Sequence, residues 1–164
     1  MKIVTDRLIL EEAKISDIED IMAMERNPQY SPYIWSGSYE EHLAEIENPN
    51  CLLIAFRNKE TGAFEGFSLN YIDGKSHVFE LRRIAVVQRG KGYGREAIEA
   101  IFDYAFEEEN INRLWLDVYP HNKAGIGLYE SLGMKIDGVL RQSYKSGDEY
   151  WDQIIYSILR DEWK

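Results

Sequence analysis

The chain is poor in cysteine and contains no long apolar run. Cys51 is its only cysteine, which excludes an intrachain disulfide and a cysteine-rich metal cage and suits a reducing compartment. No stretch approaches the roughly 18 apolar residues of a membrane-spanning helix, and the first residues lack the apolar segment of a secretion signal. We therefore expect a cytoplasmic protein that is neither exported nor embedded in a membrane.

Basic residues and histidines are also scarce. The chain has 19 Lys and Arg against 29 Asp and Glu, a formal net charge of -10, which repels nucleic-acid phosphates and anionic lipids. His42, His77 and His121 are scattered and show no paired metal-ligand spacing with Cys51. We expect no metal, no nucleic-acid partner and no membrane partner, whereas a cationic substrate would be attracted.

Length and patterning indicate one domain over residues 1–164, without repeats, linkers or low-complexity segments. Short apolar runs bounded by turn signals predict about seven strands, at 7–12, three within 51–87, one at 114–118 and two within 134–161. Helical periodicity predicts about four helices, one over 92–108 and three with the expected N-caps Ser16, Ser38 and Asn122. The mixture predicts an α+β fold.

A glycine-rich turn between a buried strand and a helix is the most informative segment. The strand Glu80–Val86 leads to Arg89-Gly-Lys-Gly92-Tyr-Gly94-Arg95, where the helix begins. Glycines allow close approach of a ligand, and the free N–H groups of a first helical turn favour phosphate. No Gly-Lys-Ser or Gly-Lys-Thr ends the turn, which argues against a P-loop. A dinucleotide-binding turn and a plain helix cap stay open as alternatives at this point.

Three motifs carry a resemblance to the GNAT superfamily over nearly the whole chain. The turn 89–94 resembles its Arg/Gln-x-x-Gly-x-Gly/Ala signature, and 122–134 resembles its Asn-x-x-(Ala/Ser)-x-x-x-Tyr-x-x-x-Gly-Phe stretch, with Gly125 and Met134 as departures. The opening Thr5-Asp-Arg-Leu-Ile-Leu10 is similar to the branch that includes ribosomal-protein N-terminal and spermidine acetyltransferases. This resemblance implies a three-layer α/β/α fold, with a mostly antiparallel sheet whose splayed central strands hold acetyl-CoA.

The resemblance also implies which residues bind acetyl-CoA. They lie on the end of the strand before the turn, in the turn itself and on the later helix: Ile84, Ala85, Val86, Arg89, Gly90, Lys91, Gly92, Tyr93, Gly94, Arg95, Asn122 and Tyr129. Unpaired strand backbone offers N–H and C=O groups to an amide-containing arm. A backbone N–H near Val86 is an expected oxyanion donor, if a bulge opens the strand there.

Tyr129 and Glu80 are the catalytic candidates that the resemblance implies. Tyr129 would protonate the departing thiolate, and Glu80 would accept a proton from the amine, directly or through water, before direct attack on the thioester. Tyr129 can also be read as a core tyrosine, and Glu80 as a strand-end carboxylate paired with Arg82. Asp117 and Asp152 are weaker substitutes for the base.

The expected function is transfer of an acetyl group from acetyl-CoA to a primary amine. By the resemblance, an aromatic pocket would receive a small cationic acceptor, polyamine-like or aminoglycoside-like, and its members are Tyr30, Tyr33, Trp35, Tyr39, Tyr150 and Trp151. The same side chains could instead form a core edge or a homodimer contact. The alternatives are acetylation of a protein N-terminus and a non-catalytic sensor that binds acetyl-CoA without turnover.

Overall fold

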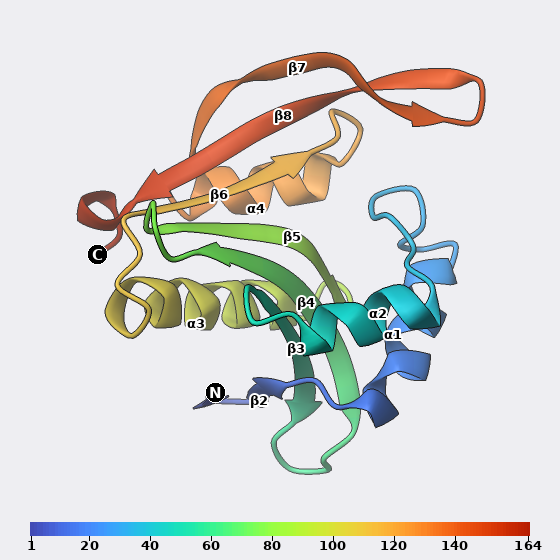
Figure 1. Cartoon of the computed structure of the whole chain (residues 1–164), viewed down its shortest axis with the longest axis vertical. Helices are drawn as coiled ribbons and strands as arrows, with labels where there is room; N and C mark the ends of the chain where they lie inside the picture. Colours follow the sequence, from blue (N-terminus) through green and yellow to red (C-terminus); the bar gives the residue numbers. More distant parts are fainter.

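One eight-stranded sheet forms the centre of the structure, a computed structural model that describes residues 1–164 (Figure 1). Its strands are β1 (Lys2–Val4), β2 (Leu8–Glu12), β3 (Cys51–Asn58), β4 (Phe64–Asp73), β5 (Val78–Val86), β6 (Arg113–Val118), β7 (Lys135–Ser146) and β8 (Glu149–Leu159). Their spatial order is β1-β2-β3-β4-β5-β6-β8-β7, and only the β5–β6 pair is parallel. The mixed, mostly antiparallel sheet that we expected is confirmed.

Helices cover both faces of this sheet. The helices are α1 (Ile18–Arg26), α2 (Tyr39–Glu47), α3 (Tyr93–Glu107) and α4 (Lys123–Ser131), with short 3-10 turns at Ile15–Asp17 and Arg160–Glu162. Alternate residues of β3 enter two separate cores: Leu52 and Ile54 pack with the α3 side, whereas Leu53 packs with the α1 side. The three-layer α/β/α arrangement is therefore confirmed. No helix is both long and apolar enough to cross a membrane.

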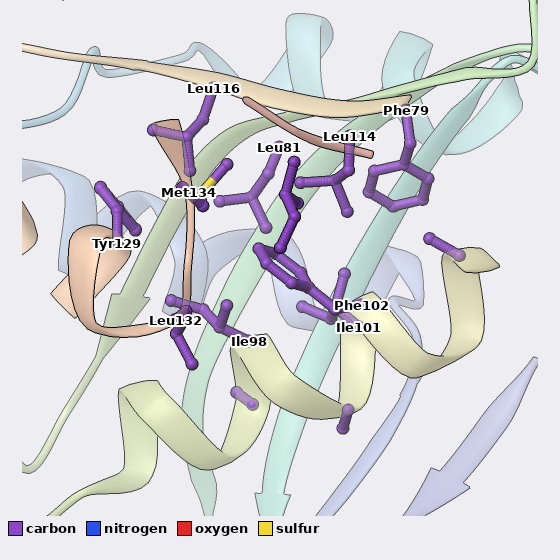
Figure 2. Close-up of a cluster of buried hydrophobic side chains, with 14 of the residues drawn as sticks. Phe79, Leu81, Ile98, Ile101, Phe102, Leu114, Leu116, Tyr129, Leu132 and Met134 are labelled. Atoms are coloured by element: carbon purple, nitrogen blue, oxygen red, sulfur yellow. The ribbon is translucent and has the colours of Figure 1, made fainter. Parts of the chain in front are cut away.

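The larger core lies between the sheet and the helices α3 and α4. Phe79 and Leu81 from β5 meet Ile98 and Phe102 from α3, and Figure 2 shows these side chains directed toward one another. Phe102 is fully buried. Helical spacing of apolar residues along α3 gives it the buried face that the sequence predicts. This core fixes the helix whose first turn borders the candidate site.

Two local details differ from the sequence reading: an edge strand was not predicted, and one predicted helix cap was wrong. The sheet has eight strands because Lys2–Val4 adds an edge strand to β2, after a tight turn in which the Thr5 N–H donates to the Leu8 carbonyl at 2.9 Å. Ser16 does not cap α1, because a 3-10 turn precedes the helix and Asp17 holds the N-cap position. In contrast, Ser38 and Asn122 cap α2 and α4 as predicted, each side chain accepting a backbone N–H of the first turn.

The strands β5 and β6 separate after a short paired segment. Their ladder ends at the pair Glu80 and Trp115, although β5 continues to Val86 and β6 to Val118. A bulge in β5 occurs at Arg82, since Leu81 and Arg83 pair with adjacent residues of β4. The predicted splayed central pair is therefore present, with Glu80 at the point where the two strands part.

Candidate active site

A cleft of about 410 Å³ opens where β5 and β6 diverge. Its walls come from β5 residues 80–86, from the segment 30–35 between α1 and α2, from β6 and the following loop, from α4, and from the β7–β8 hairpin. Of the 24 residues that line the cleft, 15 are apolar, and the others include a few charged and hydroxyl groups. This composition is typical of a site for a small molecule. The cleft thus gathers segments that lie far apart in the sequence.

The glycine-rich turn borders this cleft and leads into α3. Gly90 and Gly92 have φ values of +75° and +82°, a conformation that side chains with a Cβ adopt at a cost. Gly92 is the N-cap of α3, so the free N–H groups of the first turn point out of the helix beside it. Arg7, immediately before β2, fixes the turn by donating to the Lys91 carbonyl at 2.8 Å and to Glu96 at 2.7 Å.

The three cations of the turn have different surroundings. Arg89 lines the cleft, donates to the Gln29 carbonyl at 3.1 Å, and lies 5.7 Å from the ring centre of Tyr33. Lys91 is exposed and donates to the Gln88 side chain at 2.8 Å. Arg95 bridges α3 to α4 through the Ser131 hydroxyl. All three remain exposed enough to reach an anion placed at the helix start.

The other residues predicted for acetyl-CoA divide between the cleft and its rim. Gly94, Asn122 and Tyr129 line the cleft together with the end of β5, whereas Gly90–Tyr93 lie in the adjoining turn. Asn122 accepts the Gly125 N–H at 3.0 Å, and this cap sets the start of α4. The strand has no bulge at Val86, where we expected one. The register shift of β5 lies at Arg82 instead.

Tyr129 is directed into the cleft from α4 and is 8% exposed. Burial, and after it the negative charge of Asp117, raises the pKa of Tyr129 to about 12. The phenol consequently stays protonated at neutral pH and can act as a proton donor. The Tyr129 ring also belongs to the larger core, so the same side chain packs in the core and lines the cleft.

Glu80 and Asp117 form the acidic part of the cleft wall. Glu80 is half-buried and accepts from Arg82 Nε at 2.9 Å; burial raises its pKa above 4.5, Arg82 opposes this rise and Asp117 adds to it. Asp117 accepts from Gln153 Nε2 at 2.7 Å, and both residues line the cleft. A carboxylate with a raised pKa is the better proton acceptor. The Arg82 pair expected as the alternative reading does exist.

Aromatic rings of the segment 30–35 form one wall of the cleft, next to Arg89 of the glycine turn. Tyr30, Tyr33 and Trp35 line it as predicted, and the Tyr30 hydroxyl donates to the carbonyl groups of Val86 and Val87. Tyr39 and Tyr150 do not line it, because Tyr39 begins α2 on its exposed side and Tyr150 lies near the hairpin tip, 57% exposed.

Sequence reasoning missed two rings of the cleft, one just after β6 and one on the hairpin. Tyr119 and Tyr144 line the cleft with their ring centres 5.2 Å apart. The prediction that Trp151 lines the cleft was wrong, because it packs behind these rings, 5.0 Å from Tyr119. His121 stacks on Tyr119 and bonds the Pro32 carbonyl at 2.8 Å, which joins the two walls. Only the aromatic composition of 144–151 signalled this set.

A family model described as an acetyltransferase (GNAT) domain matches residues 7–135 of the chain. An uncharacterized N-acetyltransferase, YnaD, of Bacillus subtilis is 26% identical over 99% of both chains. Spermidine N(1)-acetyltransferase of Vibrio cholerae is 26% identical over 76% of this chain and 71% of that protein. The [Ribosomal protein bS18]-alanine N-acetyltransferase of Escherichia coli is 37% identical over 42% of this chain and 45% of its own.

Solved structures agree with this assignment at the level of the fold. Spermidine N-acetyltransferase from Vibrio cholerae, in complex with CoA and spermine, superposes with a TM-score of 0.86 and 21% identity over 96% of this chain and 98% of its own. The family model matches more than half of the chain, and its domain includes the glycine turn, the splayed strands and α4. The chain therefore belongs to the GNAT acetyltransferase family and is an acetyl-CoA-dependent N-acetyltransferase.

Proposed function

We propose that this enzyme acetylates a small cationic amine, with Glu80 as proton acceptor and Tyr129 as proton donor. The observation that carries the proposal is the composition of the cleft wall, where Glu80 and Asp117 line the same space as the rings of Tyr33, Tyr119 and Tyr144. Carboxylates attract an ammonium group, and aromatic faces attract it through their quadrupoles. The similarity to a spermidine N(1)-acetyltransferase supports the same acceptor class.

The arginines of the cleft do not cancel this preference. Arg82 is paired with Glu80, and Arg83, which also lines the cleft, is paired with Glu25 at 2.6 Å. Arg89 lies 5.7 Å from the Tyr33 ring centre and beside the glycine turn, where a bound phosphate is expected to neutralise it. Asp117 has only the neutral Gln153 amide as its hydrogen-bond partner. Its negative charge is therefore free to attract a cation.

The residues present fit acetyl-CoA, whose thioester supplies the acetyl group. The edge of β5 beyond Glu80 lacks a ladder to β6, so its backbone groups can hold an amide-bearing chain. Gly92, in the left-handed region, leaves the start of α3 open for phosphate, and Arg89, Lys91 and Arg95 are the nearby cations. These groups would hold the co-substrate along the end of β5 and at the start of α3, and leave the space beside Glu80 and Asp117 to the amine.

The proposed chemistry moves protons through two side chains of this chain. An alkylammonium with a pKa near 10 is unreactive, so Glu80 accepts one of its protons, directly or through water, before the nitrogen lone pair forms the new C–N bond. The C–S bond breaks as Tyr129 gives its proton to the departing thiolate, and the second proton that the acylated nitrogen loses restores the Tyr129 phenol, directly or through water. Asp117, close enough to raise the pKa values of both groups, orients the ammonium and repels a second negative charge.

Gly92→Ala is expected to weaken acetyl-CoA binding by about tenfold. A Cβ at φ +82° strains the turn and would lie 3.3 Å from the Arg7 guanidinium that fixes the loop. Isothermal titration with acetyl-CoA measures the effect. Gly62→Ala is the matched control, because Gly62 has φ +73° and nothing within 4 Å, so it should lose stability without losing affinity. If both variants bound acetyl-CoA equally well, the result would count against acetyl-CoA binding at the glycine turn.

The acceptor is tested by thiol release across polyamines, aminoglycosides, amino acids and N-terminal peptides. We expect turnover with small polycations, and Asp117→Asn should raise their KM about tenfold, because one attractive charge is lost while the Gln153 bond is kept. Asp103→Asn is the control, since Asp103 accepts from Trp163 at 2.8 Å away from the cleft. If only peptides were acetylated, the acceptor would be a protein N-terminus and not a small amine. If acetyl-CoA bound without turnover of any amine, the protein would be a sensor.

A further inference from the structure

A cluster of four charged side chains lies under the segment 27–37, which we call the arm. The His42 ring bonds Glu25 at 2.6 Å and Glu45 at 2.7 Å, and Arg83 bonds Glu25 at 2.6 Å and Glu45 at 3.5 Å. Glu25 and His42 are fully buried. The cluster joins α1, α2 and β5, three elements distant in the sequence.

Burying such a cluster is energetically unfavourable, and a contribution to stability alone does not explain why it is present. Removing charges from water costs several kcal/mol per ion, and well-packed apolar residues often serve equally well in their place. Glu25 lies four residues after the buried Ile21, on the apolar face of α1, where a hydrophobic side chain would be the default. Here two carboxylates and two cations satisfy one another instead, which fixes a single arrangement of the three elements.

The arm is attached to this cluster at several points. The Glu25 carboxylate accepts the Gly37 N–H at 3.2 Å, and the Ser36 hydroxyl donates to the Glu25 carbonyl at 3.0 Å. The Arg83 guanidinium lies 4.6 Å from the ring centre of Trp35, which lines the cleft. The cluster therefore holds the side of the arm that faces away from the cleft, while its rings form the cleft wall.

We propose that Glu25 and His42 are positioning residues that hold the arm against β5 and thereby set how tightly the acceptor amine binds. This inference rests on the proposed function, because it assumes that the acceptor contacts the rings of the arm. Neither residue lines the cleft, so both act through Trp35 and its neighbours. Acetyl-CoA binding should change less, because the start of the arm keeps its own bonds to the cofactor residues, from Tyr30 to the Val86 carbonyl and from Arg89 to the Gln29 carbonyl.

The pH at which the cluster fails follows from His42. Burial by itself lowers the His42 pKa, but hydrogen bonds and negative charges of Glu25 on α1 and Glu45 on α2 outweigh it and raise the pKa to about 9. Arg83 on β5 is the other charged group of the cluster, bonded to both carboxylates. Since the folded pKa exceeds 6.5, the stabilisation is complete below pH 6.5 and is lost as the pH rises through about 9.

The test compares His42→Gln with Asp17→Asn. Asp17 is a buried carboxylate bonded to Arg57 at 2.6 Å, outside the cleft, so its variant loses a comparable contact without touching the arm. We expect His42→Gln to raise the acceptor KM about tenfold, with kcat and acetyl-CoA affinity changed less than twofold. Amide hydrogen exchange of residues 27–37 should accelerate in this variant alone. In the wild type it should accelerate above the intrinsic rate increase as the pH passes 9.

Two results would overturn the inference. One is an unchanged rate of amide hydrogen exchange in the arm of His42→Gln. The other is an equal rise in the acceptor KM for Asp17→Asn, which would indicate a loss of stability throughout the fold and not an effect on the arm. Glu45→Gln serves if His42→Gln does not fold, because it removes one charge from the partly exposed end of the cluster. Hydrogen exchange needs no substrate, so it tests the positioning of the arm even if no cationic amine is acetylated and the proposed function fails.

Discussion

Tyr129→Phe is expected to lower kcat by a factor of roughly 100 to 10,000 while leaving the affinity for acetyl-CoA within twofold. The substitution removes only the hydroxyl, and with it the proton for the departing thiolate. Because the pKa of Tyr129 is about 12, the wild-type phenol is protonated throughout the assay range, and the loss should be the same from pH 6 to 9. Steady-state thiol release and calorimetric titration of acetyl-CoA measure the two quantities.

The control for this change is Tyr104→Phe. Tyr104 is a half-buried tyrosine of α3 whose hydroxyl donates to Glu109, and it does not line the cleft. Its variant should lose stability and keep kcat. A Tyr129→Phe enzyme with undiminished kcat would assign the phenol to packing alone, since its ring already belongs to the larger core.

Glu80→Gln is expected to lower kcat/KM by about 100-fold at neutral pH, because the amide cannot take the proton of the ammonium. The wild-type rate should fall as the pH is lowered through the raised pKa of Glu80, above 4.5, since the carboxylate must be unprotonated to accept. The variant should lack this limb. Its deficit should shrink toward pH 10, where the amine loses its proton without help. Profiles of kcat/KM against pH measure both effects.

Glu11→Gln is the matched control for the carboxylate. Glu11 accepts from Arg57 Nε at 2.9 Å, the same arrangement as Glu80 with Arg82, and it lies outside the cleft. It should leave the pH profile unchanged. If Glu80→Gln kept the wild-type profile, the proton would leave through water or another group, and Asp117 would be the next residue to replace.

Some features of this protein follow from short stretches of sequence. The glycine turn 89–94 and the cap at Asn122 depend on backbone preferences within a few residues, so the start of α3 and of α4 could be predicted. The Leu8–Glu12, Tyr39–Glu47 and Arg113–Val118 elements also follow from local periodicity. The edge strand Lys2–Val4 could not, since three residues carry too little pattern to predict a strand.

The cleft depended on contacts that no local pattern specifies. Asp117, Tyr119 and Tyr144 reach it because β6 is the neighbour of β5 in the sheet and the β7–β8 hairpin pairs with β6, and no local sequence pattern distinguishes these residues. Tyr150 fails to reach it for the same reason, because the hairpin register places it at the start of β8, beside the hairpin tip. Aromatic composition therefore indicated the kind of wall but not all of its members.

By itself the sequence indicated the family, which the family model confirms, and it predicted the glycine turn as the acetyl-CoA site and the two catalytic candidates, because glycines, caps and motif spacing depend on short stretches of chain. Only the tertiary structure decided the rest. The fork after Glu80 and Trp115 depends on where two strands stop pairing. The cluster of Glu25, His42 and Arg83 depends on packing two helices against a strand, which brings together charges 17 to 58 residues apart and makes their burial tolerable only in that arrangement.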